Sequence, residues 1–335
     1  MIWEMSLICS ISGLAVGLAL LAWSADLFVE NAASLARRCG LSTFVVGMFI
    51  IGFGTSMPEL MVSLFSSLEN DPGIALGNAY GSNIANILLI LGVSACMRPL
   101  SVAASARRLE MPILLAVTVL SYLLHMDGRL VRAESLVLLA MFAIWCASSG
   151  IGHAGSSDAA DSAQAPSREP AGGRWRMVAL VLVGLVALVG SSRLLVVSAV
   201  SLAIAAGVPE LVVGLSVVAV GTSLPELASS IAAMAKGEDD MAVGNVIGSN
   251  IFNALIVVGV AGTVRPLVGG VATDTIAEVL ARDFPAMAAS IVLLMVFSMR
   301  RGSKGESSLG RAHGVAFLIC YAAYMALLAR KALSC

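Results

Sequence analysis

Charged residues are scarce in this chain. Only 12% of the 335 residues are Asp, Glu, Lys or Arg, whereas 59% are hydrophobic, and the mean hydropathy is +0.94. A soluble domain carries about a quarter charged residues, so this composition excludes an ordinary soluble fold. Apolar runs of about 20 residues, the length of a bilayer-spanning helix, recur along the whole sequence. The sequence therefore predicts an all-α integral membrane protein with the lipid bilayer as its main partner.

Sulfur and imidazole ligands are also sparse. The six cysteines lie far apart without a CxxC pair, and the three histidines fall in expected loops or at the ends of expected spans. No basic run with interleaved aromatic residues is present, so we expect no nucleic-acid partner. We also expect no enzyme activity and no cofactor. The first residues, MIWEM, lack the positive stretch of a cleavable signal peptide.

Ten apolar segments predict ten transmembrane helices, of which the first and sixth extend as long tilted helices. The expected spans are 6–24, 43–66, 74–97, 109–125, 133–150, 176–205, 210–234, 241–263, 284–299 and 312–330. A polar stretch rich in Ala, Ser, Gly and Pro follows the fifth span and has the composition of a flexible linker. The expected division is a first five-helix repeat over 1–150, a linker over 151–175 and a second five-helix repeat over 176–335.

Lys and Arg are distributed unevenly between the two ends of the expected spans. If the N-terminus is outside, thirteen of them lie at inner ends and six at outer ends, with Arg193 inside a span. Because inner loops are enriched in Lys and Arg, this bias predicts a protein of the cell (inner) membrane with both termini outside and the linker in the cytoplasm. Arg129 and Arg132 fall on the side opposite to the majority.

Two motifs occur twice at a constant spacing. GFGTSMPELMVS from Gly52 returns as AVGTSLPELASS from Ala219, and GNAYGSNIAN from Gly77 returns as GNVIGSNIFN from Gly244, each 167 residues later. The motif region of about 43–99 thus matches that of about 210–266 without a gap. Corresponding positions are separated by five expected spans, an odd number, so the two copies cross the membrane in opposite directions. Such inverted repeats are frequent in secondary transporters, with the site near the midplane.

Glu59 and Glu226 lie at equivalent places in the middle of apolar spans. A charge at that depth costs at least a few kcal/mol without a partner, and neither glutamate has a Lys or Arg nearby in its own segment. The side chains three and four residues earlier, broadly on the same helical face, are hydroxylic in both copies: Thr55, Ser56, Thr222 and Ser223. Pro58 and Pro225 also free a backbone carbonyl in each span, because proline has no N–H.

The second motif adds a serine and an asparagine four residues apart in each copy. These residues are Ser82, Asn86, Ser249 and Asn253. The combined set contains only oxygen ligands, which suits a hard cation: Ca2+ takes six to eight oxygens, whereas transition metals prefer His or Cys. Two carboxylates neutralise one Ca2+, and several Na+ could use the same oxygens.

Four other polar residues near the motifs are open to different interpretations. Asn78 and Asn245 either brace the crossing helices or touch the ion, and we favour bracing. Asp26 and Glu30 in the first span are matched by Arg193 and Val197 in the sixth. This asymmetry favours a place at the rim or in an interhelical pair over a place in a symmetric site.

GTSMPE with GNAYGSN, and GTSLPE with GNVIGSN, resemble the two alpha-repeats of the cation/Ca2+ exchanger superfamily, in particular its sodium/calcium exchanger family in the minimal prokaryotic form. The resemblance covers about residues 5–330. It implies two inverted five-helix halves, ions held by the second, third, seventh and eighth helices, and long first and sixth helices that slide across the core. The ligands it implies are Thr55, Ser56, Glu59, Ser82, Asn86, Thr222, Ser223, Glu226, Ser249 and Asn253, with carbonyls near Gly52 and Ala219.

Departures from the superfamily pattern narrow the expected activity. Asn253 stands where K+-transporting members carry Asp, and Gly81 and Gly248 stand at about the place where proton/calcium exchangers usually carry Glu. We therefore expect an electrogenic antiporter that exchanges Ca2+ for Na+ by alternating access, with a monomer sufficient. One alternative is a proton/Ca2+ or broader divalent cation exchanger on the same scaffold. Another is a non-transporting membrane scaffold or a channel.

Overall fold

The structure is a computed structural model that describes residues 7–39, 41–69, 72–152, 174–206, 219–299 and 308–334. It confirms the all-α fold. The helices of the first half are α1 (Leu7–Cys39), α2 (Thr43–Val46), η1 (Gly47–Ile51), α3 (Gly52–Thr55), α4 (Met57–Leu68), α5 (Pro72–Ala85), η2 (Asn86–Ile90), α6 (Leu91–Met97), η3 (Ala106–Glu110), α7 (Met111–His125) and α8 (Arg132–Gly152). Those of the second half are α10 (Arg174–Ala205), α12 (Ala219–Thr222), α13 (Leu224–Ala235), α14 (Asp239–Phe252), η5 (Asn253–Val257), α15 (Val258–Val264), α16 (Gly270–Glu278), η6 (Val279–Asp283), α17 (Phe284–Met299) and α18 (Arg311–Ser334).

Most of the expected spans are present as long apolar helices. Among the described residues, seven helices are long and apolar enough to cross a bilayer, and the bent pair Thr43–Thr55 and Met57–Leu68 makes an eighth. The expected fifth span corresponds to α8, and the expected seventh to α12 and α13. Residues 210–218 of the seventh span, and most of the expected linker, lie outside the described residues. The protein is thus a multi-pass membrane protein, while the count of ten remains a prediction.

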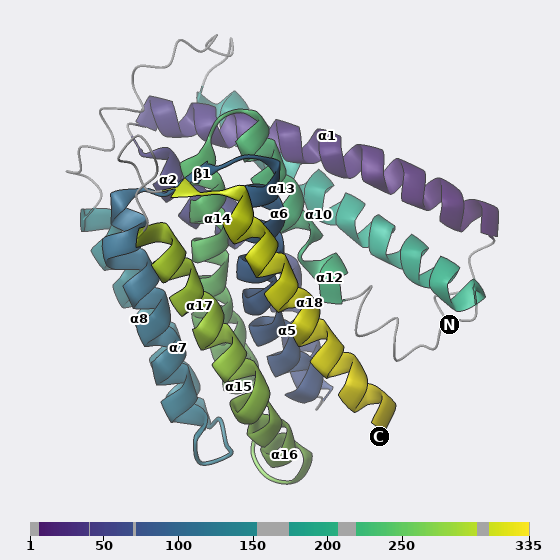
Figure 1. Cartoon of the computed structure of the whole chain (residues 1–335), viewed down its shortest axis with the longest axis vertical. Coiled ribbons are helices and arrows are strands. Elements are labelled where there is room, and N and C mark those ends of the chain that lie inside the picture. The colour runs from purple at the N-terminus through teal and green to yellow at the C-terminus, as the bar shows by residue number, and fades with distance from the viewer. Residues whose placement is uncertain are drawn as a thin grey trace.

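Two long helices lie side by side along one face of the molecule (Figure 1). They are α1, with 33 residues, and α10, with 32, as expected for the first and sixth spans. A Cβ at Gly17 would lie 3.3 Å from the Leu195 backbone, and one at Gly184 would lie 2.9 Å from the Phe28 backbone. Gly184 follows Gly17, and Leu195 follows Phe28, by 167 residues. The same close approach is therefore made twice with the halves exchanged, and small residues permit it.

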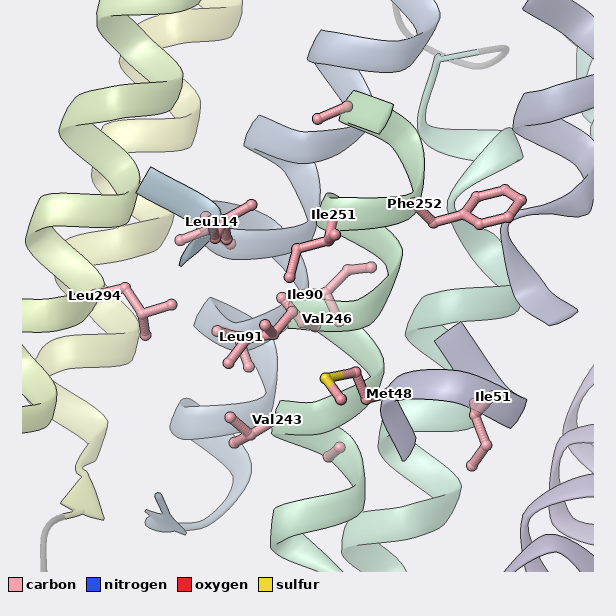
Figure 2. Close-up of a cluster of buried hydrophobic side chains, with 14 of the residues drawn as sticks. Met48, Ile51, Ile90, Leu91, Leu114, Val243, Val246, Ile251, Phe252 and Leu294 are labelled. Atoms are coloured by element: carbon pink, nitrogen blue, oxygen red, sulfur yellow. The ribbon is translucent and has the colours of Figure 1, made fainter. Parts of the chain in front are cut away.

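The core behind these helices is centred on α14. Figure 2 shows Val243 and Val246 of α14 beside Met48 of η1, with Ile90 and Leu91 on the neighbouring chain segment. At Gly244 and Gly248, a Cβ would collide with the backbone carbonyls of Phe44 and Met48, respectively. The partners that would make the equivalent contacts with Gly77 and Gly81 belong to 207–218, outside the described residues.

The helices of the core contain π-helical turns at equivalent places. η2 begins at Asn86 and η5 begins at Asn253, 167 residues apart. A π-helical turn widens the helix locally, and such turns are frequent at functional sites. A feature that the sequence did not predict is a short antiparallel pair of β1 (Leu100–Ser101) and β2 (Ser308–Leu309), which joins the end of α6 to the start of α18.

Candidate functional site

Both spans that carry the first motif are broken at the same point. Ser56 separates α3 from α4 with φ −84° and ψ 7°, and Ser223 separates α12 from α13 with φ −89° and ψ 8°. The bend between the two first-half segments is 41°. Pro58 and Pro225 occupy the first turn after each break, where a missing N–H costs no intrahelical bond. Each motif thus places its glutamate in the first turn of a new helix.

The position of these helix starts favours negative charge. Glu59 and Glu226 both lie in a first turn, where the helix dipole stabilises a carboxylate. Both side chains are fully buried, with 0% exposure. Among the described residues, both carboxylate oxygens of Glu59 and the Oε2 atom of Glu226 have no hydrogen-bond partner. Buried acceptors of this kind are costly unless a cation or proton meets them, so the site suits a positively charged ligand.

The hydroxyl groups reach across from one half to the other. Ser56 Oγ donates to Glu226 Oε1 at 3.0 Å, and the Thr55 hydroxyl also lies beside Glu226. In the opposite sense, the Ser223 hydroxyl lies beside Glu59. This differs from the expectation that Ser56 shares a helical face with Glu59. The helix breaks at Ser56, so its side chain turns toward the other half.

The second motif supplies further oxygens from α5 and α14. The Ser82 hydroxyl lies beside Glu59, and Ser249 Oγ donates to the Gly52 carbonyl at 3.0 Å. Asn86 Nδ2 donates to Asn250 Oδ1 at 3.0 Å. Among the described residues, the Oδ1 atoms of Asn86 and Asn253 lack a hydrogen-bond partner. These two oxygens remain available to a cation.

The remaining predicted ligands lie at the helix break of the second half. Ala219 begins α12, and Thr222 ends it beside a cavity. The Gly221 carbonyl accepts a hydrogen bond from Ser192 Oγ at 3.0 Å. That carbonyl was expected to be freed by Pro225, and a serine of α10 satisfies it instead.

Asn78 and Asn245 make the hydrogen bonds expected of residues that brace the crossing helices. Asn78 Nδ2 donates to the Glu59 carbonyl at 2.9 Å and to Ser63 Oγ at 2.9 Å. Asn245 Nδ2 donates to the Glu226 carbonyl at 3.2 Å, and also to the hydroxyls of Ser229 and Ser230. Each asparagine therefore holds the backbone of the helix that carries the neighbouring glutamate. Asn245 Oδ1 also accepts from Thr55 Oγ1 at 3.3 Å.

Sequence reasoning missed a pair of asparagines that joins the two halves directly. Asn83 Nδ2 donates to the Asn250 carbonyl at 3.1 Å, and Asn250 Nδ2 donates to the Asn83 carbonyl at 3.2 Å. The two residues are equivalent, 167 positions apart. Ser24 Oγ and Ser191 Oγ, also equivalent, lie 3.4 Å apart. The GSN sequence, repeated in both copies of the second motif, was the signal that could have identified Asn83 and Asn250.

The resulting donor set consists of two carboxylates with neutral oxygens around them. Among the described residues, no group of three or more His, Cys, Asp or Glu side chains could hold a metal. Since Ca2+ takes six to eight oxygen ligands, most of them would be hydroxyl, amide and backbone oxygens. Such an arrangement can bind a hard cation reversibly.

Two equivalent helical halves that meet at a pair of buried carboxylates define a membrane transporter for cations. The sequence profile of the family described as "Sodium/calcium exchanger protein" matches residues 9–149 and 176–330. The chain belongs to this family of membrane antiporters and is not an enzyme. The resemblance inferred from the motifs is thereby confirmed.

Similar proteins span nearly the whole chain. CaxA of Alkalimonas amylolytica, which carries the name of an antiporter, is 39% identical and covers 93% of this chain and 96% of its own length. The inner membrane protein YrbG of Escherichia coli (strain K12) is 36% identical, with 89% and 91% covered. A structure of the sodium-calcium exchanger NCX_Mj soaked with Na+ and Sr2+ has a TM-score of 0.77 and 28% identity, and covers 96% of this chain and 98% of its own.

Proposed function

We propose that this protein exchanges Ca2+ for Na+ across the inner membrane by alternating access. The observation that carries the proposal is the crosswise arrangement of the site, in which Ser56 Oγ donates to Glu226 Oε1 of the other half and the Ser223 hydroxyl lies beside Glu59. A site built by both halves can be exposed to either side when the halves move against each other. The printed names of similar proteins support the choice of ions: one is the sodium/calcium exchanger MaX1 of Methanosarcina acetivorans.

The charge of the site accounts for exchange in place of leak. Glu59 and Glu226 are buried, and among the described residues neither forms an ion pair with Lys or Arg, so the unloaded pair would carry two uncompensated charges in an apolar environment. That state is costly to move through the core. Either Ca2+ or Na+ removes the cost, so the loaded protein reorients far more readily. We propose that more than two Na+ replace one Ca2+, since the neutral oxygens extend beyond the two carboxylates, and that the cycle is therefore electrogenic.

The proposed ligands are the side chains of both motifs together with two backbone carbonyls. They are Thr55, Ser56, Glu59, Ser82, Asn86, Thr222, Ser223, Glu226, Ser249 and Asn253, with the carbonyls near Gly52 and Ala219. We further propose repeats over 1–150 and 176–335, with the linker 151–175 in the cytoplasm and both termini outside. The Lys and Arg bias supports that orientation, and the name of the Escherichia coli relative supports the inner membrane.

The test is uptake of radiolabelled Ca2+ into proteoliposomes that contain Na+, K+ or only a pH gradient. Uptake that requires internal Na+ is the expected result. Uptake driven by the pH gradient alone would contradict Na+ coupling and support the proton/Ca2+ alternative, while flux without any counter-ion would indicate a channel.

Replacement of one carboxylate connects the activity to the site. Glu59→Gln should abolish Na+-driven uptake, because a single remaining carboxylate leaves Ca2+ half neutralised. The matched control is Glu134→Gln at the start of α8, where the amide oxygen can still accept the Val131 N–H that Glu134 now accepts at 2.8 Å. Unchanged uptake by Glu59→Gln would refute the assignment.

A further inference from the structure

Four charged residues outside the candidate site are related by the repeat. Arg193 of α10 follows Asp26 of α1 by 167 positions, and Lys236 after α13 follows Glu69 after α4 by the same 167 positions. The first half carries the two acids and the second half the two bases, so each long helix can pair with the loop of the opposite half. In the pair Asp26–Lys236 the long helix carries the acid and the loop the base, and in the pair Glu69–Arg193 the signs are reversed.

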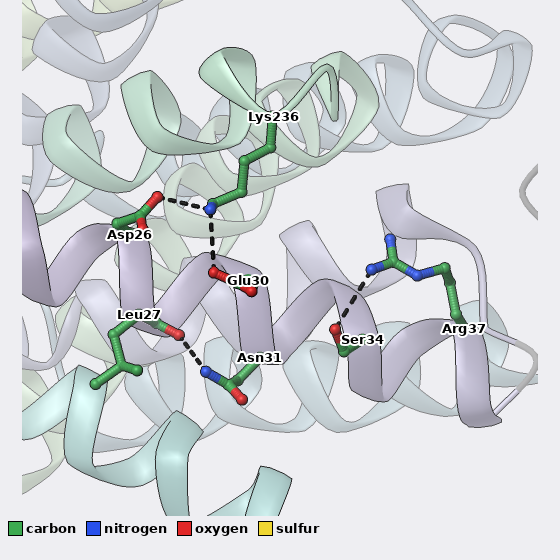
Figure 3. A network of polar contacts seen from close by, with 7 residues as sticks. All are labelled: Asp26, Leu27, Glu30, Asn31, Ser34, Arg37 and Lys236. Carbon is green, nitrogen blue, oxygen red and sulfur yellow. Dashed lines mark hydrogen bonds and ion pairs between the residues drawn. The ribbon is translucent and has the colours of Figure 1, made fainter. Parts of the chain in front are cut away.

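The first of these pairs is formed in the structure. Lys236 Nζ lies 2.6 Å from Asp26 Oδ1 and 3.3 Å from Glu30 Oε2 (Figure 3). Close by, Arg37 NH1 lies 2.9 Å from Glu238 Oε1. These ion pairs connect α1 to the segment between α13 and α14, and so hold the two elements together on that side of the membrane.

The second pair is apart. Glu69 and Arg193 line a common cavity of about 530 Å³, and no ion pair between them is present among the described residues. The cavity is also lined by Pro58, Gly221 and Thr222 at the helix breaks of the candidate site. It therefore extends from the Glu69 end of α4 to the first motif of both halves. The site is approached from the Glu69 side, whereas the Lys236 side is held by ion pairs.

We propose that Asp26–Lys236 and Glu69–Arg193 are mutually exclusive latches, one for each side of the membrane. This inference rests on the proposed alternating access. In an inverted-repeat transporter, the opposite-facing state arises by movement of one repeat against the other around the fixed site. If each half then takes the arrangement of the other, Arg193 and Glu69 form the contact that Asp26 and Lys236 form now. At the same time Asp26 separates from Lys236. The reversed signs make that second contact an attraction.

The two latches differ in strength. Glu30 and Arg37 reinforce the Lys236 side, but their equivalent positions hold Val197 and Ile204. The charges therefore favour the state that is open on the Glu69 side. The Asp26 side chain is 59% exposed, and exposed ion pairs are weak, so each pair shifts the balance by about two- to fivefold.

Cysteine crosslinking tests the inference without any transport measurement. In a variant with all six native cysteines replaced, Asp26→Cys with Lys236→Cys should form a disulfide readily in vesicles under mild oxidation. Glu69→Cys with Arg193→Cys should form it slowly. The Asp26→Cys and Lys236→Cys variant cannot report on the second latch, because it abolishes the first ion pair itself. The variant with Glu69→Cys and Arg193→Cys is therefore combined with Lys236→Asp, which breaks the Asp26–Lys236 pair. That change should raise the rate of the Glu69/Arg193 disulfide several-fold, while the matched surface change Arg108→Asp leaves the rate as it was.

A charge exchange supplies the second measurement. Asp26→Lys combined with Lys236→Asp restores the attraction and should return the Glu69/Arg193 disulfide rate to its original value. A rate that Lys236→Asp leaves unchanged, or that the exchange does not reverse, would overturn the inference. Crosslinking is independent of the driving ion. Loss of Na+ coupling with intact reciprocal crosslinking would therefore refute only the proposed function, and Na+/Ca2+ exchange without reciprocal crosslinking would refute only the latches.

Discussion

Asn83 and Asn250 hydrogen-bond to each other's backbone carbonyl across the two halves of the protein, at 3.1 and 3.2 Å. Both side chains are fully buried, and the two bonds are related by exchange of the halves. The pair therefore marks the local axis about which α5 and α14 are arranged. It also fixes the relative position of the Ser82 and Ser249 hydroxyls one residue earlier in the chain.

Loss of either asparagine should destabilise the protein, and Asn250→Ala should do so more strongly because it also removes the acceptor of Asn86 Nδ2. Asn83→Ala and Asn250→Ala each leave a buried carbonyl without its donor, which costs about 1–3 kcal/mol. The measurement is the midpoint of thermal unfolding in detergent for each variant beside the unsubstituted protein. A loss confined to one of the two variants would contradict the equivalence of the two bonds.

Removal of a crosswise hydroxyl should weaken ion binding without loss of the fold. Ser56→Ala deletes the donor to Glu226 Oε1, and a hydrogen bond to a charged group contributes about 1.5–3 kcal/mol. We expect at least about a tenfold rise in the Ca2+ concentration for half-maximal uptake, since 1.4 kcal/mol corresponds to about tenfold. Ser223→Ala should also raise this concentration, because it removes the proposed hydroxyl ligand at the equivalent position beside Glu59. Ser148→Ala, which removes a bond to the Trp145 carbonyl in α8, is the control and should not alter uptake.

A third carboxylate should unbalance the site. Asn253→Asp adds a third buried carboxylate to the proposed ligand set, so that one bound Ca2+ no longer neutralises that set. The Ca2+-loaded form then carries the kind of uncompensated charge that is costly to move. Maximal Na+-driven uptake should fall severalfold, and addition of K+ on both sides should restore part of it if K+ supplies the missing charge. Asn253→Ser leaves the side chain uncharged and should not reproduce the fall in maximal uptake.

The close approach of α14 to η1 should tolerate no additional methyl group. A Cβ at Gly248 would collide with the Met48 carbonyl, and overpacking of a core costs about 1–3 kcal/mol. Gly248→Ala should therefore lower the thermal unfolding midpoint. At Gly190 in α10 a Cβ meets nothing within 4 Å, so Gly190→Ala should leave the midpoint unchanged or raise it slightly. Equal effects of both substitutions would show that the backbone contact is not tight.

Much of this architecture was predictable because transmembrane helices can be recognised from the composition of short sequence segments. The apolar runs of α1 and α10 and the helix-breaking Pro58 and Pro225 are properties of short segments. The constant offset between Glu59 and Glu226 follows from direct comparison of the two motif copies. A bilayer requires each span to satisfy its own backbone, so the composition of a span decides its structure with little help from distant residues. The family, too, was identifiable from the repeated motifs alone.

The partners of the side chains were decided only by the tertiary structure. Helical periodicity grouped Ser56 with Glu59, but the break at Ser56 turns the hydroxyl to Glu226 of the other half. The Ser192 hydroxyl on the Gly221 carbonyl and the Lys236 bridge to Asp26 likewise join segments far apart in the chain. Such contacts depend on how two helices cross and rotate, which is set by packing at sites such as Gly17 and Gly184. The sequence by itself thus determined which oxygens and charges this protein carries, and the packing of its two halves determined which of them meet.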